Sequence, residues 1–123
     1  MRIPTLILAA TVLLAAVPAF AAGDASNGAA IFQRCASCHN ADKDGGNGLG
    51  PNLLGVAGRK AASLPDFPYS PALRNSHIVW TDAKLKAWIS GPSKLVPGTR
   101  MSFPGLSKPG QADDVIAYLH TRK

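Results

Sequence analysis

The sequence predicts a small all-α domain with long loops. Three segments carry helix caps followed by apolar residues at helical spacing, and no segment alternates apolar and polar residues as a half-buried strand does. The length of 123 residues, without an internal repeat, indicates a single domain. The 12 Gly and 10 Pro exceed average usage but stay below the share that is typical of low-complexity disorder. Large all-β and doubly wound α/β folds are therefore disfavoured.

Residues 1–21 have the pattern of a secretory signal peptide. The basic residue Arg2 is followed by a stretch rich in Leu, Ile, Val and Ala, and the segment ends with Ala19 and Ala21 at the spacing of a cleavage site. We expect cleavage after Ala21, which leaves residues 22–123 as the folded domain. A membrane anchor is the alternative, although the apolar stretch barely reaches the roughly 20 residues that a spanning helix needs.

The first helix is expected to begin after Asp24, a good capping residue, and to run to about Arg34. Gly28 and Phe32 are four apart and share one face of this helix. A glycine inside a helix costs about 0.5–1 kcal/mol relative to alanine, so Gly28 indicates the close approach of another helix. Alternatively, Gly28 is simply a poor helix residue near a frayed start.

Residues 40–67 are predicted to form a loop. Gly and Pro occur there too often for a long helix or strand. Something other than regular backbone hydrogen bonding must therefore order this segment.

Two helices are expected in the next part of the chain. The pair Ser70-Pro71, a cap followed by a first-turn proline, predicts a short helix to about Asn75. Thr81 or Asp82 can cap a longer helix, which Gly91-Pro92 ends. The apolar face of that longer helix consists of Leu85, Trp88 and Ile89.

The last main helix follows Pro109-Gly110. Asp113 and Asp114 stand in its first turn, where negative charge suits the helix dipole. Its apolar face consists of Ala112, Val115, Ile116 and Leu119. Three main helices and one short one leave a marginal core, because a domain of this length buries only about two thirds of its unfolded surface. A large bound apolar cofactor would complete such a core.

The pentapeptide Cys35-Ala36-Ser37-Cys38-His39 carries the chemistry. The pattern C-x-x-C-H is typical of c-type haem attachment, because two cysteines three apart can each form a thioether to one porphyrin edge while the histidine lies beneath the iron. Three alternatives stay open. A disulfide between the two cysteines suits an exported protein, a thioredoxin-like site needs a βαβ pattern, and a zinc site needs further ligands, for which only His77 and His120 remain.

A haem iron held by His39 needs a sixth ligand, and Met101 is the candidate. The chain has 2 methionines, and the other, Met1, lies in the predicted signal peptide. Met101 stands in a segment rich in Pro and Gly that suits neither helix nor strand, so it has no place on a periodic apolar face. The alternatives are that Met101 fills the core, as Met commonly does, or that His77 or His120 is the sixth ligand.

Taken together, these residues resemble the mitochondrial-type class I cytochromes c and their soluble bacterial relatives. The resemblance covers nearly all of the chain after residue 21, and the order of its motifs is far more specific than C-x-x-C-H alone. Besides the pentapeptide, the matching residues are Gly28, Phe32, Gly50-Pro51-Asn52-Leu53, Gly58-Arg59, Tyr69, Trp80, Pro97-Gly98-Thr99-Arg100-Met101, Phe103, Gly105-Leu106 and Ile116-Ala117-Tyr118-Leu119. The resemblance implies the class I cytochrome c fold, in which helices and long loops surround a covalently bound haem.

The resemblance also implies how the cofactor is held. Cys35 and Cys38 would bind one haem c covalently, with His39 and Met101 as the axial ligands of its iron. The carbonyl of Pro51 would accept the second N–H of His39, which orients the ring and raises its basicity.

Further members of the implied haem site lie along the chain. Arg59, Tyr69 and Trp80 would hydrogen-bond a buried propionate, whose charge is otherwise costly to desolvate. Thr99 would contact the haem beside Met101, and Phe103 would lie near the edge at which the electron leaves. For Tyr69 and Trp80, ordinary aromatic core packing is the alternative.

The function implied by the resemblance is soluble electron transfer without enzyme activity. Filled axial positions leave no open site for a substrate, and a buried haem with Met/His ligation has a raised reduction potential. The expected partners are membrane redox complexes, such as a cytochrome c reductase and an oxidase or reaction centre, with transient electrostatic docking and no nucleic acid. The net charge of +6 agrees with steering toward acidic partners. A periplasmic monomer is expected.

Two departures from the family pattern stand out. Trp88 occupies a position where the family commonly has a Tyr near the axial Met, and an indole donates but does not accept a hydrogen bond. The hydrogen bonding around the sulfur, and with it the reduction potential, stays open. Ser93 and Ser107 stand where Lys is frequent, although Arg34, Lys60, Lys94, Arg100 and Lys108 remain basic.

Three rival functions are considered. A small peroxidase would open the iron by losing Met101, but no distal His stands next to an Arg in a recognisable arrangement. A subunit of a larger respiratory or dehydrogenase complex would carry the same haem with a permanent partner. An exported module with a disulfide and no cofactor is the third.

Overall fold

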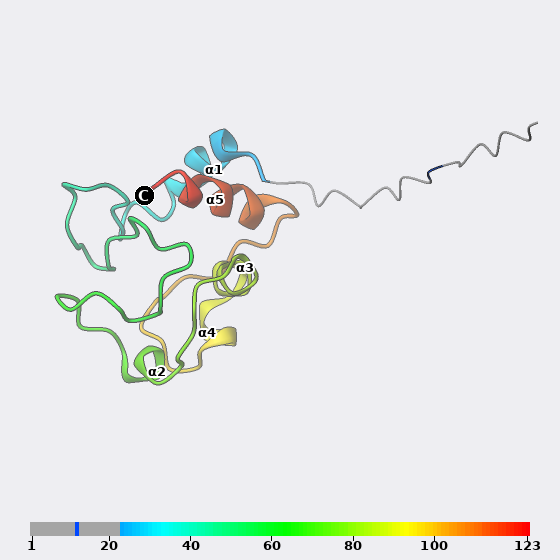
Figure 1. Ribbon diagram of the computed structural model, residues 1–123. Helices are drawn as coiled ribbons and strands as arrows, with labels where there is room; N and C mark the ends of the chain where they lie inside the picture. The colour runs from blue at the N-terminus through cyan, green and yellow to red at the C-terminus, as the bar shows by residue number, and fades with distance from the viewer. Residues whose placement is uncertain (1–11, 13–22) are drawn as a thin grey trace, which may run out of the picture.

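The computed structural model describes residue 12 and residues 23–123, and five helices lie in the second of these stretches (Figure 1). The helices are α1 (Ala25–Phe32), α2 (Pro71–Arg74), α3 (Asp82–Ser90), α4 (Pro92–Leu95) and α5 (Gln111–His120). Apart from position 12, the predicted signal peptide 1–21 lies outside the described residues. No helix in the described part of the chain is long and apolar enough to cross a membrane.

α1 begins at its predicted cap and ends earlier than expected. The Asp24 side chain accepts a hydrogen bond from the Asn27 amide at 2.9 Å. The helix stops at Phe32 instead of Arg34, because the following residues form tight turns in which the Cys35 amide donates to the Phe32 carbonyl and the His39 amide to the Cys35 carbonyl. These turns hold the C-x-x-C-H motif at the end of the helix.

α1 packs against α5, and Gly28 lies at their crossing (Figure 1). A Cβ atom at Gly28 would overlap the carbonyl oxygen of Asp114 and would lie 2.9 Å from Cβ of Tyr118. The predicted close approach of a second helix is therefore confirmed. The Phe32 and Tyr118 rings meet at the same crossing, with centroids 5.0 Å apart.

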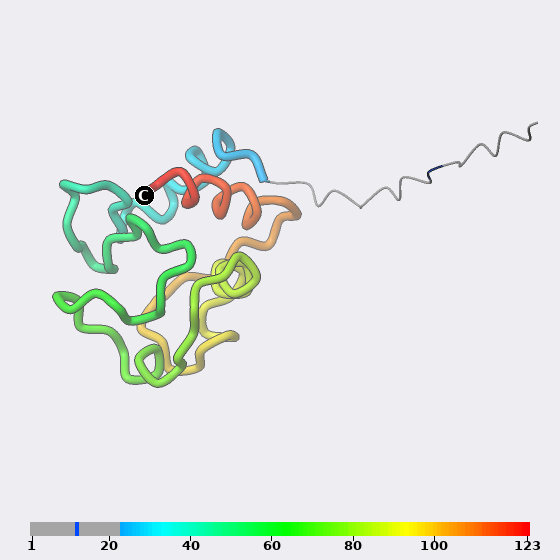
Figure 2. The backbone as a smooth tube through the Cα atoms, viewed as in Figure 1, coloured from blue at the N-terminus to red at the C-terminus, as the bar shows by residue number. Residues whose placement is uncertain are grey.

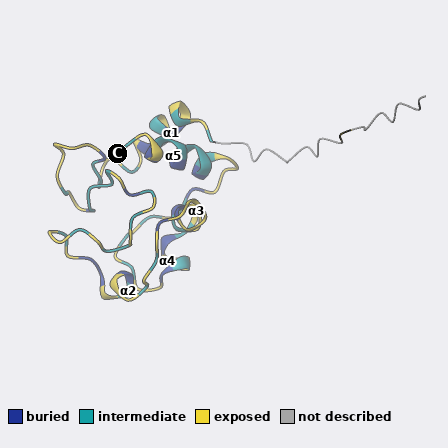
Figure 3. Ribbon diagram, in the orientation of Figure 1, coloured by how far each residue is buried: buried dark blue, intermediate teal, exposed yellow. Residues whose placement is uncertain are grey.

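The predicted apolar faces of the longer helices point inward, as the burial pattern in Figure 3 shows. In α3, Leu85 and Ile89 are buried, while Trp88 is half-buried and its ring lies 5.2 Å from that of Trp80. In α5, the buried residues are the four predicted ones, Ala112, Val115, Ile116 and Leu119.

The short helices differ from the prediction in number. α2 is the short helix expected after Ser70, whose hydroxyl accepts from the Leu73 amide at 3.1 Å. Thr81 and not Asp82 caps α3. Gly91-Pro92 ends α3 as predicted, yet Pro92 also starts a second short helix, α4. Proline fits the first turn of a helix, and the Gly91 carbonyl accepts hydrogen bonds from the amides of Lys94 and Leu95.

Residues 40–67 form the expected loop, which Figure 2 shows as wide arcs without a helix. The only strand-like pairing among residues 23–123 is an isolated bridge between Lys60 and Val79. Arg122, near the C-terminus, is hydrogen-bonded to two parts of this loop. Its Nε donates to the Ala41 carbonyl at 2.8 Å, and its own carbonyl accepts from the Gly55 amide at 2.8 Å.

Candidate functional site

Every residue that the resemblance assigns to the cofactor lines one cavity of about 860 Å³. These residues come from the turns after α1, the 40–67 loop and its continuation to α2, the segment before α3, and the loop between α4 and α5. They are Cys35, Cys38, His39, Pro51, Arg59, Tyr69, Trp80, Thr99, Met101 and Phe103. Residues that are far apart in the sequence therefore meet around a single space.

Apolar side chains from four helices complete the cavity wall. They are Phe32 of α1, Leu73 of α2, Leu85, Trp88 and Ile89 of α3, and Val115 and Leu119 of α5. Their helical spacing identifies most of them as inward-facing, but that spacing does not distinguish a residue packed on protein from one that borders a cavity. The role of these residues as cavity wall was therefore missed by sequence reasoning.

His39 is oriented by its backbone surroundings. Its Nδ1 lies 2.8 Å from the carbonyl oxygen of Pro51, so Nδ1 carries the proton that is donated and Nε2 keeps a free lone pair. Gly50 packs against the ring so closely that a Cβ atom there would lie 2.6 Å from Nδ1. Burial lowers the pKa of His39, with the Pro51 hydrogen bond opposing the shift, so the imidazole is neutral and able to bind a metal at neutral pH.

Cys35 and Cys38 are free thiols on the turns that follow α1. Burial raises the pKa of the Cys35 thiol, and the Arg34 charge beside it acts in the opposite direction. The described residues contain no group of three His, Cys, Asp or Glu side chains that could hold a metal ion, so a zinc site around this motif finds no support there.

Met101 is the candidate sixth ligand that shares the cavity with His39. It is half-buried, and its amide donates to the Thr99 hydroxyl at 3.3 Å. The two alternative ligands do not line the cavity: His77 is exposed, and Nε2 of His120 lies 2.7 Å from a carboxylate oxygen of Asp82 at the surface.

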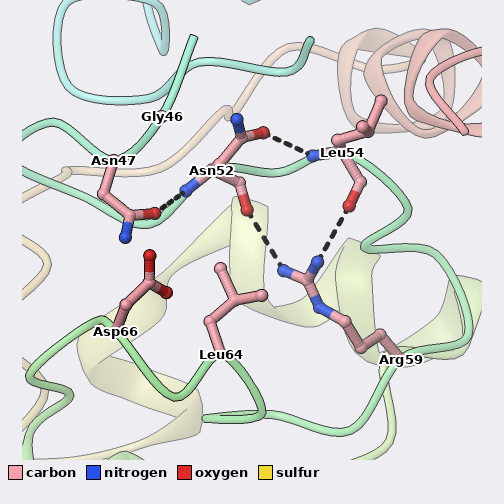
Figure 4. Close-up of a pocket in the computed structure, with 7 residues that line it drawn as sticks. All are labelled: Gly46, Asn47, Asn52, Leu54, Arg59, Leu64 and Asp66. Carbon is pink, nitrogen blue, oxygen red and sulfur yellow. Dashed lines mark hydrogen bonds between the residues drawn. The ribbon is translucent and has the colours of Figure 1, made fainter. Parts of the chain in front are cut away.

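Polar side chains line part of the cavity around Arg59, which we call its polar end. Figure 4 shows this residue beside a smaller pocket of about 260 Å³ that shares Asn47, Arg59 and Asp66 with the large cavity. The Arg59 guanidinium donates to the Leu54 carbonyl at 2.8 Å and to the Asn52 carbonyl at 3.2 Å. Arg59 therefore braces the loop from inside and retains further N–H donors.

Two more donors lie at this end of the cavity. The Tyr69 hydroxyl accepts a hydrogen bond from the Leu64 amide at 3.3 Å, which leaves its own O–H to donate. Trp80 is only 7% exposed and lines the cavity, and the hydrogen bonds recorded among the described residues do not involve its indole N–H. No fully buried side-chain N or O atom in that part of the chain lacks a partner, so this N–H is not sealed inside the protein, and like the Tyr69 hydroxyl it can donate to an acceptor in the cavity.

The residues present fit a haem c. The cavity is apolar over most of its wall. The thiols of Cys35 and Cys38 and the oriented imidazole of His39 line it next to one another in the chain, and the thioether of Met101 reaches it from the loop between α4 and α5. The hydrogen-bond donors described above suit carboxylates. At the rim, the Arg34 guanidinium lies 5.7 Å from the centroid of the Phe103 ring.

Comparisons with known proteins agree with this geometry. The family model described as Cytochrome c matches residues 25–123. A cytochrome c homolog of Rickettsia felis is 51% identical over 98 residues, and the match covers 80% of this chain and 56% of that protein. Cytochrome c2 of Rhodoblastus acidophilus is 46% identical over 98 residues, with 80% of this chain and 92% of that protein covered.

Among solved structures, cytochrome cH from Methylobacterium extorquens superposes with a TM-score of 0.76 at 47% sequence identity. That match covers 80% of this chain and 99% of the cytochrome cH chain. The chain thus spans little more than half the length of the Rickettsia felis relative and nearly all of the other two proteins.

Proposed function

This chain belongs to the cytochrome c family, and we propose that it is an electron carrier with one covalently bound haem c. The observation that carries the proposal is the meeting of Cys35, Cys38, His39 and Met101 on one cavity. When bound there, a haem supplies an iron that takes up and releases one electron.

The chain's own residues have distinct roles in this proposal. Cys35 and Cys38 would hold the haem through two thioethers, and His39 and Met101 would hold its iron. The Pro51 carbonyl, 2.8 Å from Nδ1, holds the imidazole with Nε2 as the ligand atom. A thioether ligand opposite histidine raises the reduction potential, and the apolar wall acts in the same direction because it disfavours additional positive charge.

The polar end of the cavity would compensate the negative charge of the propionates. Arg59 would supply a permanent positive charge there, and the Tyr69 hydroxyl and the Trp80 indole N–H would donate hydrogen bonds. The Arg59 bonds to the Leu54 and Asn52 carbonyls keep the loop closed around this end.

A carrier is favoured over an enzyme because His39 and Met101 would both hold the iron. With both side chains bound, no position would be open for peroxide or oxygen. The cavity rim near Phe103, where Arg34 lies over the ring, would be the region at which an electron is exchanged. Besides Arg59, three basic residues line the cavity, namely Arg34, Lys60 and Arg100, and they would steer an acidic partner by an attraction that salt weakens.

The proposed setting is the bacterial periplasm. Residues 1–21 direct export and are cleaved, and residues 22–123 act as a monomer between membrane redox complexes, such as a cytochrome c reductase and an oxidase or reaction centre. Intact-mass analysis of the exported protein tests the cleavage. Size-exclusion chromatography of a native extract tests the carrier, because a permanent subunit elutes with its complex.

Met101→Ala is the experiment that tests the ligand set. The purified wild-type protein is expected to be red and low-spin in both oxidation states at neutral pH, with a weak charge-transfer band at the red end of the ferric spectrum. The variant is expected to keep its haem, lose that band and have a lower reduction potential. If the variant retains both the band and the potential, Met101 is not the ligand.

A further inference from the structure

The chain just before α1 is packed tightly on the first turn of α5. A Cβ atom at Gly23 would overlap the carbonyl group of Asp113 and would lie 2.7 Å from the amide nitrogen of Asp114. Because these obstacles are backbone atoms, no change of rotamer makes room for a side chain. Gly23 therefore lies directly against α5, and the same turn of α5 receives Gly28 where the two helices cross (Figure 1).

The next residue, Asp24, is held by three hydrogen bonds. Its amide donates to a carboxylate oxygen of Asp114 at 2.8 Å, across 90 positions of sequence. Its side chain accepts from the Asn27 amide at 2.9 Å, and its carbonyl accepts from the Gly28 amide at 2.9 Å. The bond to Asp114 is the one of these three that reaches another helix, and it ties the start of α1 to α5.

These contacts begin close to the bond at which residues 1–21 are proposed to be removed. Cleavage hydrolyses the peptide bond between Ala21 and Ala22 with water, leaving a carboxyl group on Ala21 and an amino group on Ala22. Gly23 and Asp24 are the second and third residues after that bond. A protease binds the residues on both sides of the cleaved bond in an extended form and pairs with their backbone. In the folded chain, α5 covers the backbone of Gly23 and holds the amide of Asp24, so both are withdrawn from a protease.

We propose that the docking of residues 23–28 on α5, with Asp114 as its polar contact, prevents the removal of residues 1–21 once the chain has folded. The inference rests on the proposed cleavage after Ala21. Cleavage then has to precede folding, or to wait until the start of α1 separates from α5. A chain that folds first keeps its apolar N-terminal segment. The same sequence therefore yields a released carrier or a form that retains this segment as an anchor, depending on which step comes first.

The strength of the Asp114 contact sets the expected rate. When opening is fast, proteolysis of a folded chain follows the fraction of molecules in which the site is open. Asp114→Ala removes the hydrogen bond to Asp24 without changing any residue near the cleaved bond in the sequence. We expect about fivefold faster cleavage, which corresponds to about 1 kcal/mol for one exposed hydrogen bond. Asp114→Asn keeps an oxygen acceptor and is expected to stay near the wild-type rate.

The assay uses the full chain, residues 1–123 with haem attached, in detergent micelles with a purified bacterial signal peptidase. Intact mass follows the removal of residues 1–21. The unfolded reference is the same chain with Cys35→Ala and Cys38→Ala, which cannot attach the cofactor that completes the core. The folded wild type is expected to be cleaved at least about tenfold more slowly than this reference, the factor for an opening free energy of about 1.4 kcal/mol.

Two matched controls separate local docking from other effects. Asp113→Ala removes the same charge from the same turn of α5, but the Asp113 carboxylate bonds to Lys86 at 3.0 Å and not to Asp24. Ser70→Ala removes the cap of α2 and lowers overall stability from another helix. Both are expected to be cleaved at the wild-type rate.

The outcomes distinguish this inference from the proposed cleavage. If the unfolded reference is not cleaved after Ala21, the proposed cleavage fails, and the inference fails with it. If the reference is cleaved and the folded wild type is cleaved as fast, the cleavage stands and the protection by α5 is overturned. The inference is also overturned if Asp114→Ala is cleaved no faster than the wild type, Asp113→Ala or Ser70→Ala, because the hydrogen bond to Asp24 then has no effect of its own.

Discussion

Gly28→Ala tests whether the crossing of α1 and α5 depends on the absence of a side chain. An added Cβ atom would overlap the Asp114 carbonyl oxygen and would lie 2.6 Å from the carbonyl carbon, whereas ordinary contact begins at 3.4 Å. Because the obstacle is backbone, no rotamer change relieves it, and the two helices must separate by roughly 1 Å, a distance that close-packed interiors do not absorb freely.

Two effects of this substitution oppose each other. Alanine favours a helix over glycine by about 0.8–1 kcal/mol. Overpacking typically costs about 1–3 kcal/mol and occasionally more. Since backbone cannot yield as a flexible side chain does, the upper part of that range applies, and the net loss is about 2 kcal/mol. For a domain of this size, such a loss lowers Tm by about 10 °C.

Urea unfolding of the holoprotein, followed by far-ultraviolet circular dichroism, measures this loss. Gly91→Ala is the matched control, because Gly91 has an extended φ of 177° and a Cβ atom there would meet nothing nearer than Lys94 Cβ at 3.5 Å. The control is expected to change the free energy of unfolding by less than about 0.5 kcal/mol. A Gly28→Ala protein as stable as the wild type would refute the account of the crossing.

Two further substitutions test the cavity and the loop around it. Trp80→Phe keeps an aromatic ring but removes the indole donor proposed to bind a propionate, so the holoprotein is expected to lose about 1.5–3 kcal/mol in urea unfolding, the range for a hydrogen bond to a charged group. An unchanged urea midpoint would mean that this donor binds nothing. Ala62 has a φ of 57°, a left-handed conformation that glycine adopts without strain. Ala62→Gly is therefore expected to raise the free energy of unfolding by about 0.5–1 kcal/mol, whereas the control Ala61→Gly is expected to lower it. Equal destabilisation by both substitutions would show that the backbone at position 62 is not strained.

The family and the helices could be predicted from residues that are near one another in the chain. A cap acts on an amide two or three residues away, as Asp24 and Ser70 do, and an apolar face repeats within one helix, as in α5. The family model and the match to cytochrome cH confirm the all-α class I cytochrome c fold. The second short helix, α4, was missed because Pro92 was interpreted only as the end of α3.

The sequence by itself determined the three longer helices, α2 and the C-x-x-C-H pentapeptide, and it predicted a cofactor that completes the core, because each of these depends on local patterns and on chain length. Only the tertiary structure decided that Met101 and not His77 or His120 shares the cavity with His39, and that Trp80 lines the same space. It also decided that Arg100 reaches the Pro68 carbonyl. Such contacts join loops that no periodic pattern orients, so their geometry follows from how the helices pack around the cavity.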